Sequence, residues 1–233
     1  MLIALYNGRR VRAQVAGSGA IGTCRWTGLP VKACVGEILQ YWAYVGGAPK
    51  LPAGYEPESE WHQQWKATID DDYCEVVMGP NNEHRADILG SDNTVIEIQH
   101  SRIDIRHSKE RVDFYRAHTG RRVIWVVDIQ EIWRKTFTLD GGRDDRGNFI
   151  VKRSPRWKWL WDLAADTDTH CFLEFNQTSN MLLQIWVHQK TLYAKYVPKH
   201  TFFLRYMDAV AKPEYRGYTP EAEAFLRHAV ANA

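Results

Sequence analysis

The sequence predicts an α/β fold in which a mixed β-sheet with flanking helices follows a small β-rich appendage. A strand–turn–strand–helix pattern runs from Glu83 to Tyr115. The near-continuous apolar run Arg122–Asp128 comes next and is typical of a strand buried on both faces. A strand, a helix and a buried strand in this order form a βαβ crossover, which places a parallel strand pair in the sheet.

Short strands are predicted for the appendage, residues 1–50. Leu2–Tyr6 and Val11–Val15 flank an Asn-Gly pair, the strongest two-residue signal for a hairpin. Gly17–Gly22 is expected to be a flexible connection, and Cys24–Val35 a second pair of strands.

The main domain is predicted to span residues 51–233, after a linker at Gly46–Pro57 that is rich in proline and glycine. Ser59 is placed to cap a helix in which His62 and Lys66 lie four residues apart and therefore share a face. These two side chains either reach a catalytic centre or are an ordinary surface pair beside Trp65.

A β-hairpin is predicted at the centre of the chain. Arg85–Leu89 is a short strand, and Gly90–Asn93 is a turn of residues that tolerate positive φ or bond their own backbone. Thr94–Gln99 alternates β-branched and polar residues, which puts Glu97 and Gln99 on one face. Pairing of the two strands would bring Asp87 opposite them.

Two carboxylates on neighbouring strands suit a hard divalent cation such as Mg²⁺, which prefers oxygen ligands and keeps several waters. Asp87, Glu97 and the carbonyl of Ile98 are the candidate ligands. Gln99 is a candidate for orienting a water, and Glu83 for a third acidic ligand or a support to the others. The alternative is a half-exposed strand pair whose polar face is simply solvated.

A helix is predicted over Ile105–His118, with Asp104 as its cap and Gly120 as its stop. Arg111 and Tyr115 share a face of this helix and would contact a phosphate or support Gln99. Further strands are expected at Leu173–Phe175 and Met181–Val187, an apolar segment at Phe202–Met207, and a last helix after the cap at Thr219.

These motifs, in this order and spacing, resemble the PD-(D/E)xK nuclease superfamily in a variant with Gln at the lysine position. They resemble the competence-protein CoiA-like nuclease family more closely. The matching residues are His62, Lys66, Glu83, Arg85-Ala86-Asp87-Ile88, Glu97-Ile98-Gln99-His100-Ser101, Arg111 and Tyr115. The resemblance implies a restriction-endonuclease-like core and hydrolysis of DNA phosphodiester bonds with Mg²⁺ or Mn²⁺. Asp87 and Glu97 would bind the metal, Gln99 would position water, and His62, Lys66, Arg111 and Tyr115 would assist.

In the resembled family the N-terminal region often carries a cysteine-based knuckle and a His-aromatic-Ala-His signature. Here only Cys24 remains, and the segment Tyr41–Tyr44 replaces the histidines. We therefore expect an appendage without metal, held together by Trp26, Tyr41, Trp42 and Tyr44. The four cysteines include no C-x-x-C pair and are expected to be buried small hydrophobes.

Basic and aromatic residues alternate between Arg153 and Trp161. Arg153, Arg156 and Lys158 would contact phosphates while Trp157 stacks on an unpaired base. The alternative, which the sequence supports equally well, is that the tryptophans pack into the core and the cations stay at the surface. Ten Lys/Arg against five Asp/Glu in residues 121–160 fit a partner that is a polyanion, although such local charge is also common on ordinary surfaces.

The sequence thus predicts a metal-dependent nuclease that acts on single- or double-stranded DNA. The alternative is a catalytically decayed nuclease fold that binds nucleic acid or a partner. No apolar run is long enough to span a membrane and no signal peptide is indicated, so a cytoplasmic location is expected. We also expect Asp87→Ala and Glu97→Ala to abolish cleavage without loss of stability, because each relieves repulsion between the carboxylates.

Overall fold

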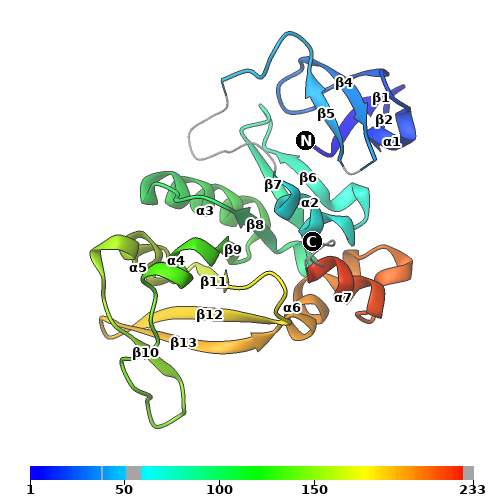
Figure 1. Ribbon diagram of the computed structural model, residues 1–233. Coiled ribbons are helices and arrows are strands. Elements are labelled where there is room, and N and C mark those ends of the chain that lie inside the picture. The colour runs from blue at the N-terminus through cyan, green and yellow to red at the C-terminus, as the bar shows by residue number, and fades with distance from the viewer. Residues whose placement is uncertain (38, 51–58, 228–233) are drawn as a thin grey trace.

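The computed structural model describes residues 1–37, 39–50 and 59–227, and these form two separate β-sheets (Figure 1). The N-terminal sheet is antiparallel, with five strands in the order β2-β1-β3-β4-β5. The larger sheet is mixed, with eight strands in the order β10-β13-β12-β11-β9-β8-β7-β6. The predicted α/β architecture with an N-terminal β-rich part is confirmed.

The first hairpin forms as its Asn-Gly turn predicts. Asn7 and Gly8 have φ values of 50° and 75°, the left-handed conformations that a two-residue turn of this type needs. Trp42 and Trp26 pack in the small core of the sheet, whereas Tyr41 is exposed and takes no part in that core. The elements are β1 Ile3–Tyr6, β2 Arg9–Arg12, α1 Ala13–Ala16, β3 Ile21–Thr23, β4 Pro30–Val35 and β5 Gln40–Tyr44.

Two local predictions in this region are wrong. The second strand ends at Arg12, and the short helix α1 replaces its expected continuation to Val15, with Ala13 fully buried at the start of the turn. The expected connection Gly17–Gly22 overlaps β3, which pairs with β4. Most of the expected linker Gly46–Pro57 falls in residues 51–58, outside the described part of the chain.

The larger sheet has the predicted crossover at its centre. Strand β9 lies between β8 and β11 and is parallel to both, while the outer strand pairs are antiparallel. Helix α3 connects β8 to β9. The strands are β6 Cys74–Met78, β7 His84–Leu89, β8 Val95–Gln99, β9 Val123–Asp128, β10 Phe149–Val151, β11 Thr169–Glu174, β12 Met181–His188 and β13 Thr191–Pro198.

Helices cover both faces of this sheet. Apolar residues of α3 and α5 pack with one face, and those of α2, α6 and α7 pack with the other. The helices are α2 Glu60–Ala67, α3 Ile105–Thr119, α4 Gln130–Lys135, α5 Lys158–Ala165, α6 Lys199–Tyr206 and α7 Pro220–Leu226. None of the described helices has both the length and the apolar character needed to cross a membrane.

The predicted caps form where the sequence places them. Asp104 accepts a hydrogen bond from the N–H of Arg106, and Gly120 ends α3 in the left-handed conformation at φ 67°. Ser59 caps α2, and Thr219 caps α7. These caps fix the ends of α2 and α3, the two helices that contribute side chains to the candidate site.

Candidate active site

The β7–β8 hairpin brings Asp87 and Glu97 together. Its strands pair at Ile88 with Ile96 and at Leu89 with Val95, and Asp87 and Glu97 are the next residue on each strand, close enough for the charge of Asp87 to act on Glu97. The N–H of Ile98 donates to Oδ2 of Asp87 at 3.0 Å. The carboxylate of Asp87 therefore links β7 to β8 just beyond the backbone pairing of the two strands.

Lys66 of α2 neutralises Asp87. Its Nζ lies 2.9 Å from Oδ1 of Asp87 and 3.7 Å from Oε1 of Glu75, and its side chain is completely buried. Burial alone would raise the pKa of Asp87, but the charge of Lys66, the nearby His62 and the Ile98 N–H hold that pKa well below its usual range. The Asp87 side chain keeps 14% of its surface exposed, so the site can be reached from solvent on this side.

Glu97 is buried on the face covered by α3. The guanidinium of Arg111 donates to Oε2 of Glu97, and Arg111 also lies over the ring of Trp125. Burial is the main cause that raises the pKa of Glu97, and the charge of Asp87 also raises it; against the opposing effects of Arg111 and the Tyr115 hydroxyl, the net pKa is about 7. The two carboxylates thus feel each other's charge, as two metal ligands sharing a site would.

The other predicted residues occupy different positions around this pair. Gln99 is buried on β8, two residues beyond Glu97 and on the same face. His62 is buried, and its Nδ1 accepts a hydrogen bond from the Ser59 N–H in a capping box. Glu83 lies outside the cluster: it is exposed, and its carboxylate accepts hydrogen bonds from the backbone and side chain of Asn81.

A comparison with family models decides the affiliation of the chain. Residues 59–195 match the model described as competence protein CoiA, nuclease-like domain. The chain belongs to this family. The match begins at the cap of α2 and includes every predicted site residue. A search of curated proteins and a search of solved structures found no match.

In this CoiA-type domain the basic, aromatic segment is partly core. Trp157 is 1% exposed, and its ring centroid lies 5.0 Å from that of Phe137, so of the two alternatives for this residue the structure has the core packing. Arg153 and Arg156 remain at the surface, and Lys158 forms an ion pair with Asp162 one turn along α5. Trp157 belongs to the turn just before α5 and packs in the same apolar cluster as Trp159 and Leu160 of that helix.

Two more groups lie near the site: Glu75, which the sequence did not predict, and His100, which the sequence indicated only as part of the matching motif. Glu75 is buried, interacts with Lys66, and accepts the N–H groups of Leu2 and Ile3, so it joins the CoiA-type domain to strand β1. His100, directly after Gln99, places its Nδ1 3.0 Å from Oδ2 of Asp128, a carboxylate oxygen that accepts this hydrogen bond. The sequence did contain a sign of the role of Glu75, because this acidic residue lies within the otherwise apolar run Cys74–Met78.

The donor set is chemically compatible with Mg²⁺ or Mn²⁺. The described residues hold no group of three or more His, Cys, Asp and Glu side chains suited to a metal. Two carboxylates and one carbonyl nevertheless suffice for ions that retain several waters. A cation would also offset the repulsion that contributes to the raised pKa of Glu97. Asp87, Glu97 and the carbonyl of Ile98 are the groups that would hold it.

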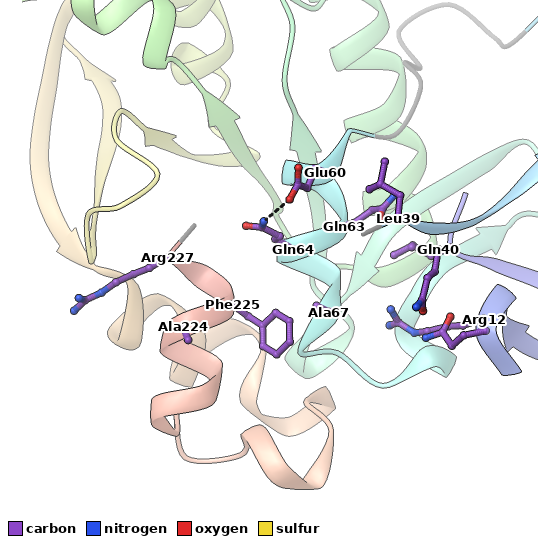
Figure 2. A pocket seen from close by; sticks show the side chains of 12 residues that line it. Arg12, Leu39, Gln40, Glu60, Gln63, Gln64, Ala67, Ala224, Phe225 and Arg227 are labelled. Atoms are coloured by element: carbon purple, nitrogen blue, oxygen red, sulfur yellow. Dashed lines mark hydrogen bonds between the residues drawn. The ribbon is translucent and has the colours of Figure 1, made fainter. Parts of the chain in front are cut away.

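A pocket elsewhere in the molecule does not contribute to this site. This cavity has a volume of about 450 Å³, and neither Asp87 nor Glu97 is part of its lining, which includes Arg12, Gln64 and Phe225 (Figure 2). Its two arginines are engaged in ion pairs, Arg12 with Asp71 and Arg227 with Glu223.

The raised pKa of Glu97 predicts how stability depends on pH in metal-free buffer. The folded protein binds this proton more tightly than the unfolded chain, so the contribution is fully present below pH 4.5 and is lost as the pH rises through about 7. The side chain that Glu97→Gln introduces stays neutral at every pH. As the pH rises from 4.5 to above 7, the free energy of unfolding of this variant should therefore increase relative to that of the wild type, by up to about 3 kcal/mol. Urea unfolding of both proteins from pH 4.5 to 8.5, with EDTA, measures the difference. Parallel stability curves would contradict the assignment.

Proposed function

We propose that this protein is a metal-dependent nuclease that hydrolyses DNA phosphodiester bonds at Asp87, Glu97 and Gln99. The observation that carries the proposal is the convergence of two carboxylates on the β7–β8 hairpin of a CoiA-type nuclease-like domain. A bound Mg²⁺ or Mn²⁺ would supply charge neutralisation at the phosphate and a more acidic water.

Each residue of the site would have a role that follows from its position. Asp87 is ionised and solvent-accessible, so it can hold a cation as substrate enters. Glu97 is fixed by Arg111, which limits the rotation of its carboxylate. The amide oxygen of Gln99 would accept a hydrogen bond from the attacking water and so aim its lone pair at phosphorus. Lys66 and Arg111 would offset negative charge near the scissile group.

The alternative is a decayed nuclease fold that binds nucleic acid or a partner without cleaving it. One observation favours it: Asp87 and Glu97 are each already paired with a cation, Lys66 and Arg111, so the site is close to neutral without metal. A cleavage assay distinguishes the two functions, because only the nuclease would cut DNA.

The direct test uses linear and circular DNA, single- and double-stranded, and a matched RNA, each incubated with the pure protein and Mn²⁺ or EDTA. We expect cleavage of DNA with Mn²⁺ and none with EDTA. Loss of circular substrate would identify endonuclease action. Cleavage that persists in EDTA would contradict the metal requirement, and intact DNA under all conditions would favour the decayed fold.

Gln99→Ala should lower turnover more than it lowers metal affinity, because its amide is expected to orient water rather than to bind the cation. Gln99→Lys, which places the commoner superfamily residue at this position, should keep at least part of the activity. Cleavage rates combined with calorimetric Mn²⁺ binding measure the two effects separately. Equal losses in rate and affinity would instead identify Gln99 as a metal ligand.

The surface cations of residues 153–158 are predicted to hold DNA outside the catalytic centre. Replacing Arg153, Arg156 and Lys158 together by Gln should weaken DNA binding at low salt. The slope of log affinity against log salt should fall by about one unit for each phosphate that the variant no longer neutralises. Cleavage at saturating DNA should hardly change. An unchanged binding curve at low salt would show that these cations only solvate the outer face of α5.

A further inference from the structure

A polar pocket of about 280 Å³ lies at the N-terminal ends of strands β8 and β9, opposite the end that carries Gln99. Its lining includes Thr94, which directly precedes β8, and Arg122, which directly precedes β9. Thr94 and Gln99 are five residues apart in extended chain, which corresponds to about 17 Å. The pocket is therefore distinct from the site at Asp87 and Glu97.

The walls of this pocket are held close together. A Cβ atom on Gly90 would lie 2.3 Å from the carbonyl oxygen of Tyr206, so only glycine allows the turn before β8 to pack against the end of α6. That packing brings Ser91 and Arg205 to one cavity. We call it the arginine pocket and define it by Ser91, Thr94, Arg121, Arg122, His170 and Arg205.

Positive charge exceeds negative charge among the described residues that line the arginine pocket. Within residues 1–37, 39–50 and 59–227, neither Arg121, Arg122 nor Arg205 forms an ion pair with a carboxylate. Arg116, which is close in sequence, is by contrast paired with Asp168. Of the described residues that line the pocket, only Asp92 is acidic. Three cations facing one cavity with a single acid attract an anion.

Neutral hydrogen-bonding groups accompany these cations. Burial lowers the pKa of His170, and the charges of Arg122 and Arg205 lower it further, so all three effects favour the neutral form of the ring. The hydroxyl of Ser91 is buried and has no hydrogen-bond partner within the described part of the chain. An unpaired buried hydroxyl is costly, and an oxygen of a bound ligand would satisfy it.

A phosphate group matches this set of donors best. Guanidinium groups form paired hydrogen bonds with the oxygens of phosphate, and arginines that approach from different elements can each engage a separate oxygen of a tetrahedral anion. Arg121 and Arg122 come from the loop before β9, and Arg205 comes from α6. We propose that the arginine pocket binds a phosphate group, carried either by a nucleic-acid backbone or by a free phosphate ester. This proposal does not depend on the nuclease activity.

The test compares the full-length wild type with an Arg122→Gln/Arg205→Gln variant, both in EDTA so that no cleavage occurs. Calorimetry with inorganic phosphate should show affinity reduced at least about tenfold in the variant, since it lacks two charge-assisted hydrogen-bond donors. Fluorescence anisotropy with duplex DNA that lacks terminal phosphates separates the two sources. Weaker DNA binding, with a salt slope smaller by about two units, identifies backbone phosphates. Unchanged DNA binding together with abolished phosphate binding identifies a free phosphate ester.

An Arg134→Gln/Arg146→Gln variant is the matched control, because both side chains are exposed and the change in net charge is the same. Thermal melting of each variant establishes that it is folded. The proposal is overturned if the wild type binds neither probe, or if the pocket and control variants bind both probes equally.

Discussion

Asp87→Asn and Glu97→Gln should each reduce DNA cleavage by at least about a hundredfold, the loss typical when one electrostatic contact to reacting charge is removed. Both substitutions keep the shape of the side chain but remove the negative charge that would hold a cation. Single-turnover cleavage with Mn²⁺ measures the effect. Glu110→Gln, on the exposed face of α3, is the control and should retain the wild-type rate.

The structure changes what is expected of the alanine variants. Asp87→Ala would remove the carboxylate at 2.9 Å from the fully buried Lys66, whereas Glu75 lies farther away, at 3.7 Å. Removing one partner of a buried pair leaves an uncompensated charge, so Asp87→Ala should unfold more easily rather than retain its stability. The asparagine variant keeps a hydrogen-bond acceptor for Lys66 and is the sharper probe. Cleavage at the wild-type rate by a folded Asp87→Asn or Glu97→Gln protein would contradict the proposed site.

The second large effect is expected at Lys199, far from the candidate site in sequence. Lys199 and Glu174 form an ion pair in which both side chains are completely buried. Glu174 also accepts hydrogen bonds from the indoles of Trp61 and Trp65 at 2.7 and 2.9 Å, and Lys199 donates to the carbonyl of Leu226. This cluster ties α2, α6 and the end of α7 to the sheet.

Lys199→Ala should therefore cost about 3–5 kcal/mol, because it leaves the Glu174 charge buried without its cation. Equilibrium urea unfolding measures this loss. Lys195→Ala, an exposed position on β13, should change stability by less than about 0.5 kcal/mol. The double variant Glu174→Gln/Lys199→Met removes both charges and should recover part of the loss. A Lys199→Ala protein as stable as the Lys195→Ala control would show that the pair contributes little.

Local patterns were sufficient for much of the fold. The Asn7-Gly8 turn, the caps of α3 and the apolar run of β9 each act over a few residues, so their signals are visible in the sequence. Strand β13, Thr191–Pro198, was missed because its pairing with β12 depends on a turn at Gln189 and Lys190 with positive φ and no glycine.

The candidate site also has a part that local sequence patterns predicted and a part that they did not. The alternation expected of β8 placed Glu97 and Gln99 on one face, and the predicted hairpin brought Asp87 close to Glu97. Glu75 could not be assigned from its strand, because its backbone turns to φ 50° and directs the side chain to Lys66 and β1. Trp157 was ambiguous because periodicity does not show which face of a short helix is covered. The Glu174–Lys199 pair spans 25 residues and depends on the packing of α6.

Calorimetric titration of the metal-free wild type with Mn²⁺, alongside Asp87→Asn, tests the central claim that Asp87 and Glu97 form a metal site. We expect saturable binding to the wild type that is abolished or greatly weakened in the variant. Absence of Mn²⁺ binding to the folded wild type, or equal binding by both proteins, would contradict the claim.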